Sequence, residues 1–117
     1  MKYRCEELTY LIDNVCFGDK ADAMTLIQSL REEILKLGRC CSFGNSSFIL
    51  IDDMSRSKHK LVGSSGLLGL YSLSNHLRQL VFINEKYEYN YLIIMSSLRF
   101  SIYYLDELIF YLRRETI

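Results

Sequence analysis

The chain has 117 residues, of which 50% are hydrophobic and 24% are charged. This composition excludes an intrinsically disordered chain, and the length suits one domain with a modest core, spanning residues 1–117. Lysine plus arginine and aspartate plus glutamate number 14 each, a balance that points to neither nucleic acid nor an anionic membrane surface as a partner.

The cysteines and the apolar segments indicate where the protein works. Four cysteines occur, at Cys5, Cys16, Cys40 and Cys41. None of them forms a CxxC pair, and this spacing favours reduced thiols over a shared metal site. The apolar run over residues 91–112 is interrupted by Arg99, Asp106 and Glu107, and such charges are costly inside a bilayer. Because the N-terminus also lacks an apolar signal-peptide core, we expect a cytoplasmic protein without a metal site.

The absence of proline favours an all-helical chain, because helix interiors tolerate proline poorly. In the first segment four apolar residues recur at helical spacing: Leu8, Leu11, Ile12 and Val15. Gly18 ends this segment, and Asp19 is suited to cap the next helix. That second helix carries a stripe with alternating spacings of four and three: Ala23, Ile27, Leu30, Ile34 and Leu37. We expect Gly38 to stop it and residues 39–46 to form a loop.

A third helix is expected to begin near Ser47, with Asn45 or Ser46 as its N-cap. One face of this helix is small or apolar and comprises Met54, Ser57, Leu61, Ser65 and Leu68. The opposite face is polar or bare and comprises Ser55, Arg56, His59, Gly63 and Gly66. This pattern predicts that His59 points to solvent. Gly63 follows one turn later on the same face, where it leaves bare backbone beside the imidazole.

Two further helices complete the chain. Gly69 fits a tight turn into the fourth helix, whose inward residues are Leu73, Leu77, Leu80 and Val81. The last and longest helix carries a heptad-type seam of Tyr91, Met95, Leu98, Ile102, Leu105, Ile109 and Leu112. A short N-terminal helix followed by four longer ones predicts an all-α fold, an antiparallel four-helix bundle with an additional short helix.

The last helix also carries a second apolar stripe, formed by Ile93, Phe100, Tyr104 and Tyr111. A helix of a four-helix bundle does not need so wide an apolar face. Two interpretations stay open. The stripe packs against the short N-terminal helix, or it contacts a second copy of the chain, as a homodimer, or a neighbouring domain of a larger kinase.

The segment from His59 to Leu80, HKLVGSSGLLGLYSLSNHLRQL, resembles the signature of histidine-containing phosphotransfer (HPt) domains. That signature reads roughly His-x-Leu-Lys-Gly-Ser-Ser/Ala-x-x-Leu-Gly, followed by a helix with regularly spaced leucines. The matching residues are His59, Leu61, Gly63, Ser64, Leu68, Gly69, Leu73, Leu77 and Leu80. The chain departs from the signature at Val62, where the family usually has lysine. Outside residues 55–82 the resemblance extends only to helix pattern and length.

The resemblance implies a phosphorelay intermediate of a multistep two-component system. His59 would accept a phosphoryl group from a receiver-domain aspartate and pass it to another receiver, so the implied partners are response-regulator receiver domains and a hybrid sensor histidine kinase. The resemblance implies a carrier rather than an enzyme, with no ATP site and no cofactor of its own, since the receiver brings Mg²⁺. The receiver is expected to dock over the third helix, through Arg56, Lys60, Val62, Gly63, Ser64 and Gly66.

The alternative function is a helical-bundle adaptor that binds a receiver or kinase domain without phosphotransfer, and Val62 keeps this alternative open. Other residues have plainer interpretations. His76 shows no spacing typical of a ligand or a base. Asp52 and Asp53 are interpreted as structural acids near a helix start. Residues 63–66 do not match a nucleotide-binding glycine loop, because the flanking Gly-Lys-Ser/Thr arrangement is missing.

Overall fold

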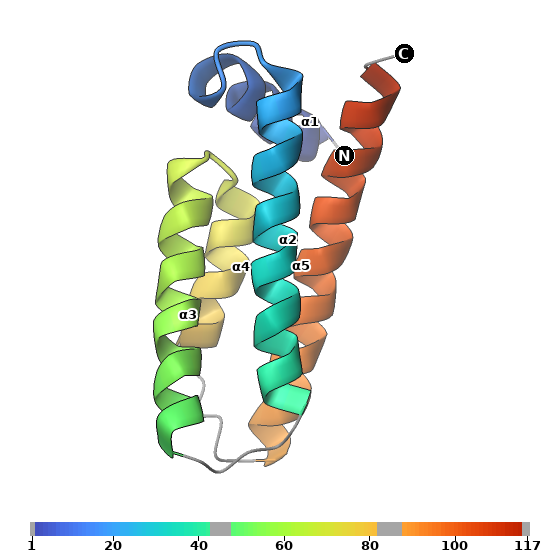
Figure 1. Cartoon of the computed structure of the whole chain (residues 1–117). Coiled ribbons are helices and arrows are strands. Elements are labelled where there is room, and N and C mark those ends of the chain that lie inside the picture. The colour runs from blue at the N-terminus through green and yellow to red at the C-terminus, as the bar shows by residue number, and fades with distance from the viewer. Residues whose placement is uncertain (1, 43–47, 82–87, 116–117) are drawn as a thin grey trace.

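The computed structural model describes the backbone of residues 2–42, 48–81 and 88–115, and every element in these ranges is helical (Figure 1). In chain order the elements are α1 (Lys2–Tyr10), a π-helical turn η1 (Leu11–Val15), α2 (Lys20–Ser42), α3 (Phe48–Leu67), α4 (Tyr71–Val81) and α5 (Glu88–Glu115). The predicted all-α fold is confirmed for this part of the chain. No helix in these ranges is long and apolar enough to cross a membrane.

The turn between η1 and α2 contains two residues with left-handed backbone. Phe17 has a φ of +53° and Gly18 a φ of +88°, a region that glycine adopts without steric cost. Asp19 then caps α2, because its Oδ1 accepts hydrogen bonds from the N–H groups of Ala21 at 2.9 Å and Asp22 at 3.2 Å. The predicted end at Gly18 and the predicted N-cap are both confirmed.

The predicted stripe of α2 is buried along its whole length. Its five buried residues are Ala23, Ile27, Leu30, Ile34 and Leu37. The predicted stop at Gly38 is wrong, because α2 continues to Ser42, and so the first part of the expected loop over residues 39–46 is helical. Gly38 packs against α5, where a Cβ on it would lie 3.8 Å from Leu98 Cδ1. This packing outweighs the weak helix propensity of glycine. Residues 43–47, which include the expected start and caps of the third helix, lie outside the described residues.

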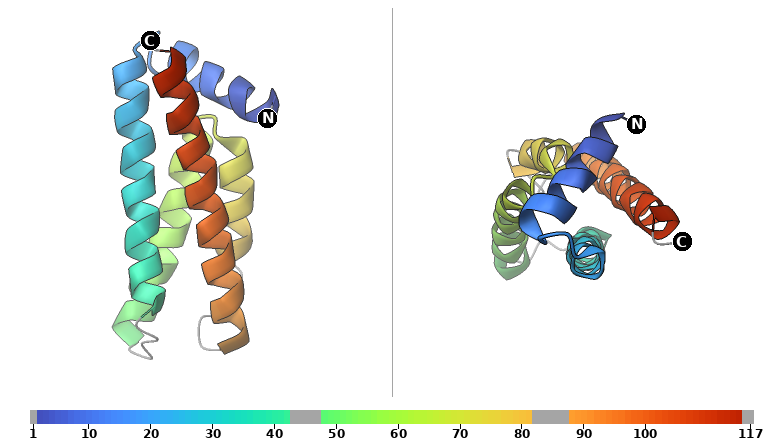
Figure 2. Two further views of the ribbon diagram at one scale, coloured as in Figure 1. Left: turned by 90° about the vertical axis from the view of Figure 1, so that its right-hand side faces the viewer. Right: turned by 90° about the horizontal axis from the view of Figure 1, so that it is seen from above.

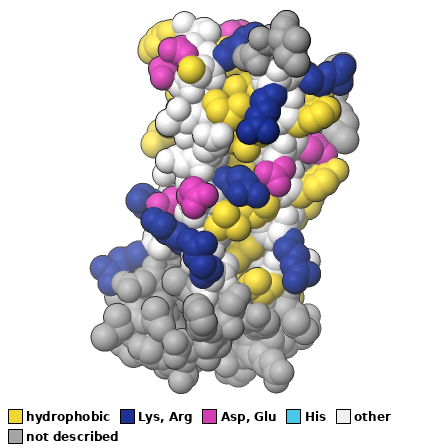
Figure 3. Space-filling view, turned by 45° about the vertical axis from the view of Figure 1, so that its right-hand side comes forward, with side chains coloured by type: hydrophobic (Ala, Val, Ile, Leu, Met, Phe, Trp, Pro, Cys, Tyr) yellow, Lys and Arg dark blue, Asp and Glu magenta, His cyan; other side chains and the backbone are white. Residues whose placement is uncertain are grey.

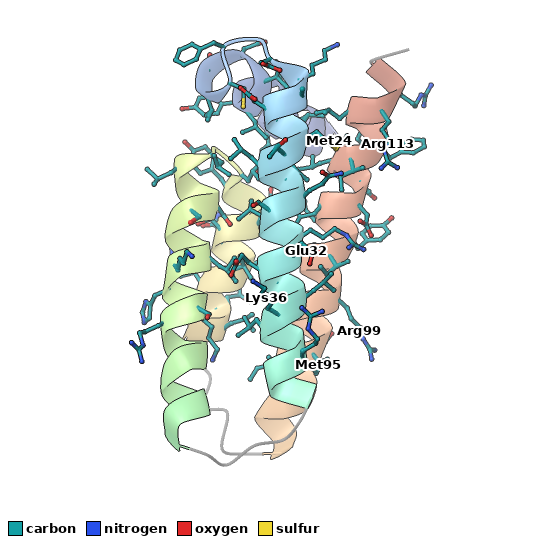
Figure 4. The ribbon with its side chains drawn as sticks, viewed as in Figure 1. Met24, Glu32, Lys36, Met95, Arg99 and Arg113 are labelled. Atoms are coloured by element: carbon teal, nitrogen blue, oxygen red, sulfur yellow. The ribbon has the colours of Figure 1, made fainter. Side chains whose placement is uncertain are left out.

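α2 and α5 run antiparallel and lie side by side. Arg31 Nε on α2 donates to Asp106 Oδ1 on α5 over 2.8 Å, and Met24 of α2 lies at the level of Arg113 of α5 (Figure 4). The most extensive helix contacts join α2 to α5 and α3 to α4, while α2 also contacts α3 and α4 contacts α5. α1 crosses one end of these helices (Figure 2). α3 and α5 therefore lie on opposite sides, with α2 and α4 between them.

The buried face of α5 is wider than the predicted seam. Three residues of the predicted heptad seam are buried: Leu98, Leu105 and Leu112. Those that are only partly buried are Met95, Ile102 and Ile109, and the side chain of Tyr91 lies outside the described residues. The buried residues that the prediction missed are Ile94, Ser101, Tyr104 and Leu108. α5 contacts α1, α2 and α4, so its buried face serves three neighbours and extends beyond one heptad seam.

Tyr104 decides between the two interpretations of the second stripe at its own position. It is buried, and its hydroxyl donates to Glu7 Oε2 of α1 over 2.5 Å. Glu7 Oε1 accepts from the N–H of Ser72, in the first turn of α4, over 2.7 Å. Packing against the N-terminal helix is thus confirmed for Tyr104, while Phe100 of the same stripe remains 43% exposed.

Candidate functional site

His59 is exposed on α3, as its sequence pattern predicts. Arg56, Lys60 and Gly63 are also exposed. Helical geometry places Arg56 one turn before and Gly63 one turn after the imidazole, while Lys60 projects about 100° around the helix from it. A Cβ on Gly63 would meet no atom within 4 Å beyond the helix's own backbone. We call Arg56, His59, Lys60 and Gly63 the His59 face.

Gly63 differs from the other described glycines. Gly18 and Gly69 have φ values of +88° and +78°, and Gly38 and Gly66 lie within ordinary contact distance of a neighbouring side chain. Gly63 combines a helical backbone with open space, so alanine would fit there and would favour the helix by about 1 kcal/mol. The described surroundings of Gly63 therefore give no packing reason for glycine at this position.

The opposite side of α3 is fixed to the core. Leu61 and Ser65 are buried as predicted, and Ser65 Oγ donates to the Leu61 carbonyl over 2.7 Å. Lys58 is also buried there. The sequence pattern did not predict this burial, because lysine is not an apolar residue. Lys58 precedes Leu61 by three residues and Ser65 by seven. This helical spacing could have placed Lys58 on the buried side of α3.

Val62 and Gly66 lie on the α4 side of α3, and both are half-buried. Ser74 Oγ of α4 donates to the Val62 carbonyl over 3.1 Å and lies 3.5 Å from the position of a Cβ on Gly66. Gly66 is therefore less open than Gly63, and its expected role in receiver binding stays a prediction. Val62 packs against the core, so the position that carries lysine in the HPt signature serves packing in this chain.

A shallow groove lies between α2 and α3, beside the His59 face. It has a volume of about 350 Å³ and is lined by Leu26, Ser29, Leu30, Glu33, Lys60, Leu61, Ser64, Leu67 and Leu68. Most of the lining is apolar, and Leu67 is 83% exposed. Two of the predicted partner-binding residues, Lys60 and Ser64, meet in this groove. An apolar side chain of a partner would fit between the two helices within reach of a lysine.

Gly69 serves the turn from α3 to α4. Its N–H donates to the Gly66 carbonyl, and the Leu70 N–H donates to the Ser65 carbonyl, each over 3.0 Å, which is the bond pattern of a Schellman motif. The ring of Tyr10 covers Gly69 so closely that a Cβ would clash with its Cδ1 and Cε1 atoms. The predicted tight turn is confirmed, and folding alone accounts for this glycine of the motif.

The second histidine joins two helices. His76 is half-buried on α4, with Nε2 3.2 Å from the Ser97 carbonyl oxygen of α5. Its ring centroid lies 4.5 Å from that of Phe100. His76 thus has a structural environment, unlike the open surroundings of His59.

Two further kinds of reactive group can be assessed among the described residues, a metal site and a free thiol. None of their histidine, cysteine, aspartate and glutamate side chains form a group of three or more that could hold a metal ion. Cys16 carries a free, buried thiol. Burial, and then the carboxylates of Asp22 and Asp19, raise the pKa of this thiol, which disfavours the nucleophilic thiolate. The side chains of Cys5, Cys40, Cys41, Asp52 and Asp53 lie outside the described residues.

Comparisons with other proteins leave the site to be interpreted from its own geometry. No protein-family model, no curated protein and no solved structure matches this chain.

Proposed function

We propose that this protein is a phosphorelay carrier, in which His59 accepts a phosphoryl group from the aspartate of one receiver domain and passes it to another. The observation that carries the proposal is the combination of an exposed histidine with a glycine one turn away, beside which a Cβ would meet only open space. A receiver must bring its phosphorylated aspartate against the imidazole nitrogen, and any side chain at position 63 would project back toward that nitrogen.

The chemistry is a direct transfer between two side chains. The imidazole nitrogen attacks phosphorus, so that an N–P bond forms while the bond from phosphorus to the aspartate oxygen breaks and the carboxylate leaves. Donation to the next receiver is the same step in reverse. The receiver supplies Mg²⁺, and this chain supplies the nucleophile and the surface that positions it. Proximity of this kind accounts for a large part of the rate of such reactions.

We further propose that helices α2 to α5 form an antiparallel four-helix bundle in the cytoplasm, and that receivers dock across the His59 face and the groove between α2 and α3. Arg56 and Lys60 make the His59 face basic, which complements an aspartyl phosphate and its neighbouring carboxylates. The groove accepts an apolar side chain beside them. A hybrid sensor kinase and a response regulator are the proposed partners.

The second candidate is an adaptor that binds a receiver without accepting phosphate. The packing of Val62 against the core favours it, because no cation stands three residues beyond His59. Both candidates use the same docking surface, and only the fate of the phosphoryl group separates them.

The test uses purified receiver domains loaded with phosphate from radiolabelled acetyl phosphate. Wild type and His76→Gln should acquire an acid-labile label, whereas His59→Gln should not. Equal labelling of His59→Gln would refute the assignment. Binding of the same receivers, measured in parallel by calorimetry, identifies the adaptor: a receiver that binds tightly yet never labels the wild type would replace the first proposal by the second.

A further inference from the structure

The outer face of α5 carries large aromatic side chains that the proposed phosphotransfer does not use. Phe100, Tyr103 and Phe110 are 43%, 57% and 57% exposed. The Arg114 guanidinium lies 5.8 Å from the centroid of the Phe110 ring. Figure 3, in which this side of the molecule comes forward, shows apolar side chains interspersed with basic and acidic ones.

These residues follow the spacing of a coiled-coil seam. Alternating steps of four and three connect Ser96, Phe100, Tyr103, Glu107, Phe110 and Arg114, which we call the outer seam. Such a repeat keeps one face of a helix toward a partner helix over its length. α5 thus has two seams, one buried against α2 and α4 and one largely exposed, at whose edge Phe100 also packs on the His76 ring of α4.

We propose that the outer seam binds a second copy of this chain, with the two α5 helices antiparallel about a twofold axis between Tyr103 and Glu107. In this register Phe100 of each chain lies opposite Phe110 of the other, and Tyr103 lies opposite Glu107. Ser96 lies opposite Arg114. Each contact occurs twice, as a twofold interface requires, and each pairs chemically matched groups: ring with ring, hydroxyl with carboxylate, hydroxyl with guanidinium.

The charges of the seam select this occupant and its orientation. A parallel pair would place Glu107 against Glu107 and Arg114 against Arg114, and facing like charges are unfavourable. The antiparallel register separates both pairs of like charges. The antiparallel register also satisfies the heptad repeat. Each residue at an a position of one helix lies opposite a residue at a d position of the other helix.

The flanks of the seam predict how strong the dimer is. Arg99 and Arg113 lie along one edge, and the antiparallel pair brings these two positions near each other. We therefore expect the aromatic contacts of the seam to supply most of the association. A single helix pair is small beside a standard interface of about 1,600 Å², so we expect a dimer that dissociates on dilution.

The first experiment measures mass by sedimentation velocity from low to high micromolar concentration, at low and high salt. Wild type should pass from monomer to dimer over this range at both salt concentrations. Phe110→Glu should raise the dissociation constant at least tenfold. Phe17→Glu, a matched change at a 91% exposed aromatic residue outside the seam, should leave it unchanged. A wild type that stays monomeric throughout, or a Phe17→Glu variant as weakened as Phe110→Glu, would overturn the proposal.

The second experiment fixes the register. Chains with Tyr103→Cys are mixed with chains with Glu107→Cys and oxidised, and the disulfides are mapped by mass spectrometry. A bond between positions 103 and 107 of different chains is expected. Bonds only between two copies of position 107 would show a parallel pair and overturn the proposal. Neither experiment involves phosphate, so this inference stands or falls independently of the proposed function.

Discussion

The two glycines of the HPt-like motif should respond to the same substitution with opposite signs. Gly63→Ala places a methyl group in open space on a helical backbone. The variant should be more stable than the wild type, by about 1 kcal/mol, because alanine restricts the unfolded chain and favours the helix. At this size the melting temperature should rise by about 4 °C.

Gly69→Ala provides the contrast. The φ of +78° is unfavourable for a residue with a Cβ, at about 1–2 kcal/mol. The new methyl group would also displace the ring of Tyr10, which packs against Gly69 and lies 6.5 Å from the ring of Tyr71. Losing this aromatic contact adds about 1 kcal/mol. The sum is a destabilisation of about 2–3 kcal/mol.

Urea denaturation followed by circular dichroism measures both free energies, and phosphotransfer assays then separate stability from function. Gly63→Leu should retain at least wild-type stability yet accept phosphate on the order of a hundredfold more slowly, since its side chain covers the imidazole. Gly69→Ala, under conditions where it is folded, should transfer normally. The access argument would be refuted by a Gly63→Leu protein that transfers at the wild-type rate. A loss of stability in Gly63→Ala would show that the position has a packing role after all.

Four further substitutions test the core and the site. Leu105→Ala should lower the free energy of unfolding by about 2–5 kcal/mol, because the side chain is completely buried; an unchanged urea midpoint would contradict the observed core. Glu7→Ala should lower it by about 2–4 kcal/mol, because two hydrogen bonds to a carboxylate are lost, and Tyr104→Phe should lower it by about half as much in the same melts. Val62→Lys should speed phosphate uptake or lengthen the lifetime of phosphorylated His59, by about 0.5–1.5 kcal/mol of partly screened attraction; identical kinetics would show that an existing cation already fills this role.

Residue spacing and single-residue backbone preferences predicted the buried stripe of α2, the helix cap, the tight turn and the exposed histidine. The buried stripe of α2 follows from its spacing, because a helix that packs along one face must repeat its apolar residues every three or four positions. The Asp19 cap and the Gly69 turn follow from the backbone preferences of single residues. The exposure of His59 follows from the polar side of α3. In each case the interactions that decide the outcome lie within a few residues of one another.

The errors arose where distant segments decide. Gly38 does not end α2, which continues to Ser42 beside α5, where a Cβ on Gly38 would lie 3.8 Å from Leu98 Cδ1. For Tyr104 the sequence left two interpretations open, and its hydrogen bond to Glu7, from the other end of the chain, decides between them. No spacing in the sequence joins these partners. Lys58 is buried although lysine side chains are usually exposed. At the candidate site, Gly66 is less open than Gly63, because Ser74 of α4 packs beside it.

The positions of the two outward surfaces bear on how a dimer would work. α3 and α5 lie on opposite sides of the molecule, since each contacts both α2 and α4 (Figure 2). A pair joined through the outer seam therefore leaves the His59 face of each chain directed away from the other. Two receivers can dock at once without meeting, and neither subunit supplies a group to the other's histidine. The rate of phosphate uptake per chain should then be the same in monomer and dimer, and Phe110→Glu should transfer as fast as the wild type. A dimer whose two histidines interfere would instead show slower uptake at high protein concentration, and that result would place the second copy on α3 rather than on α5.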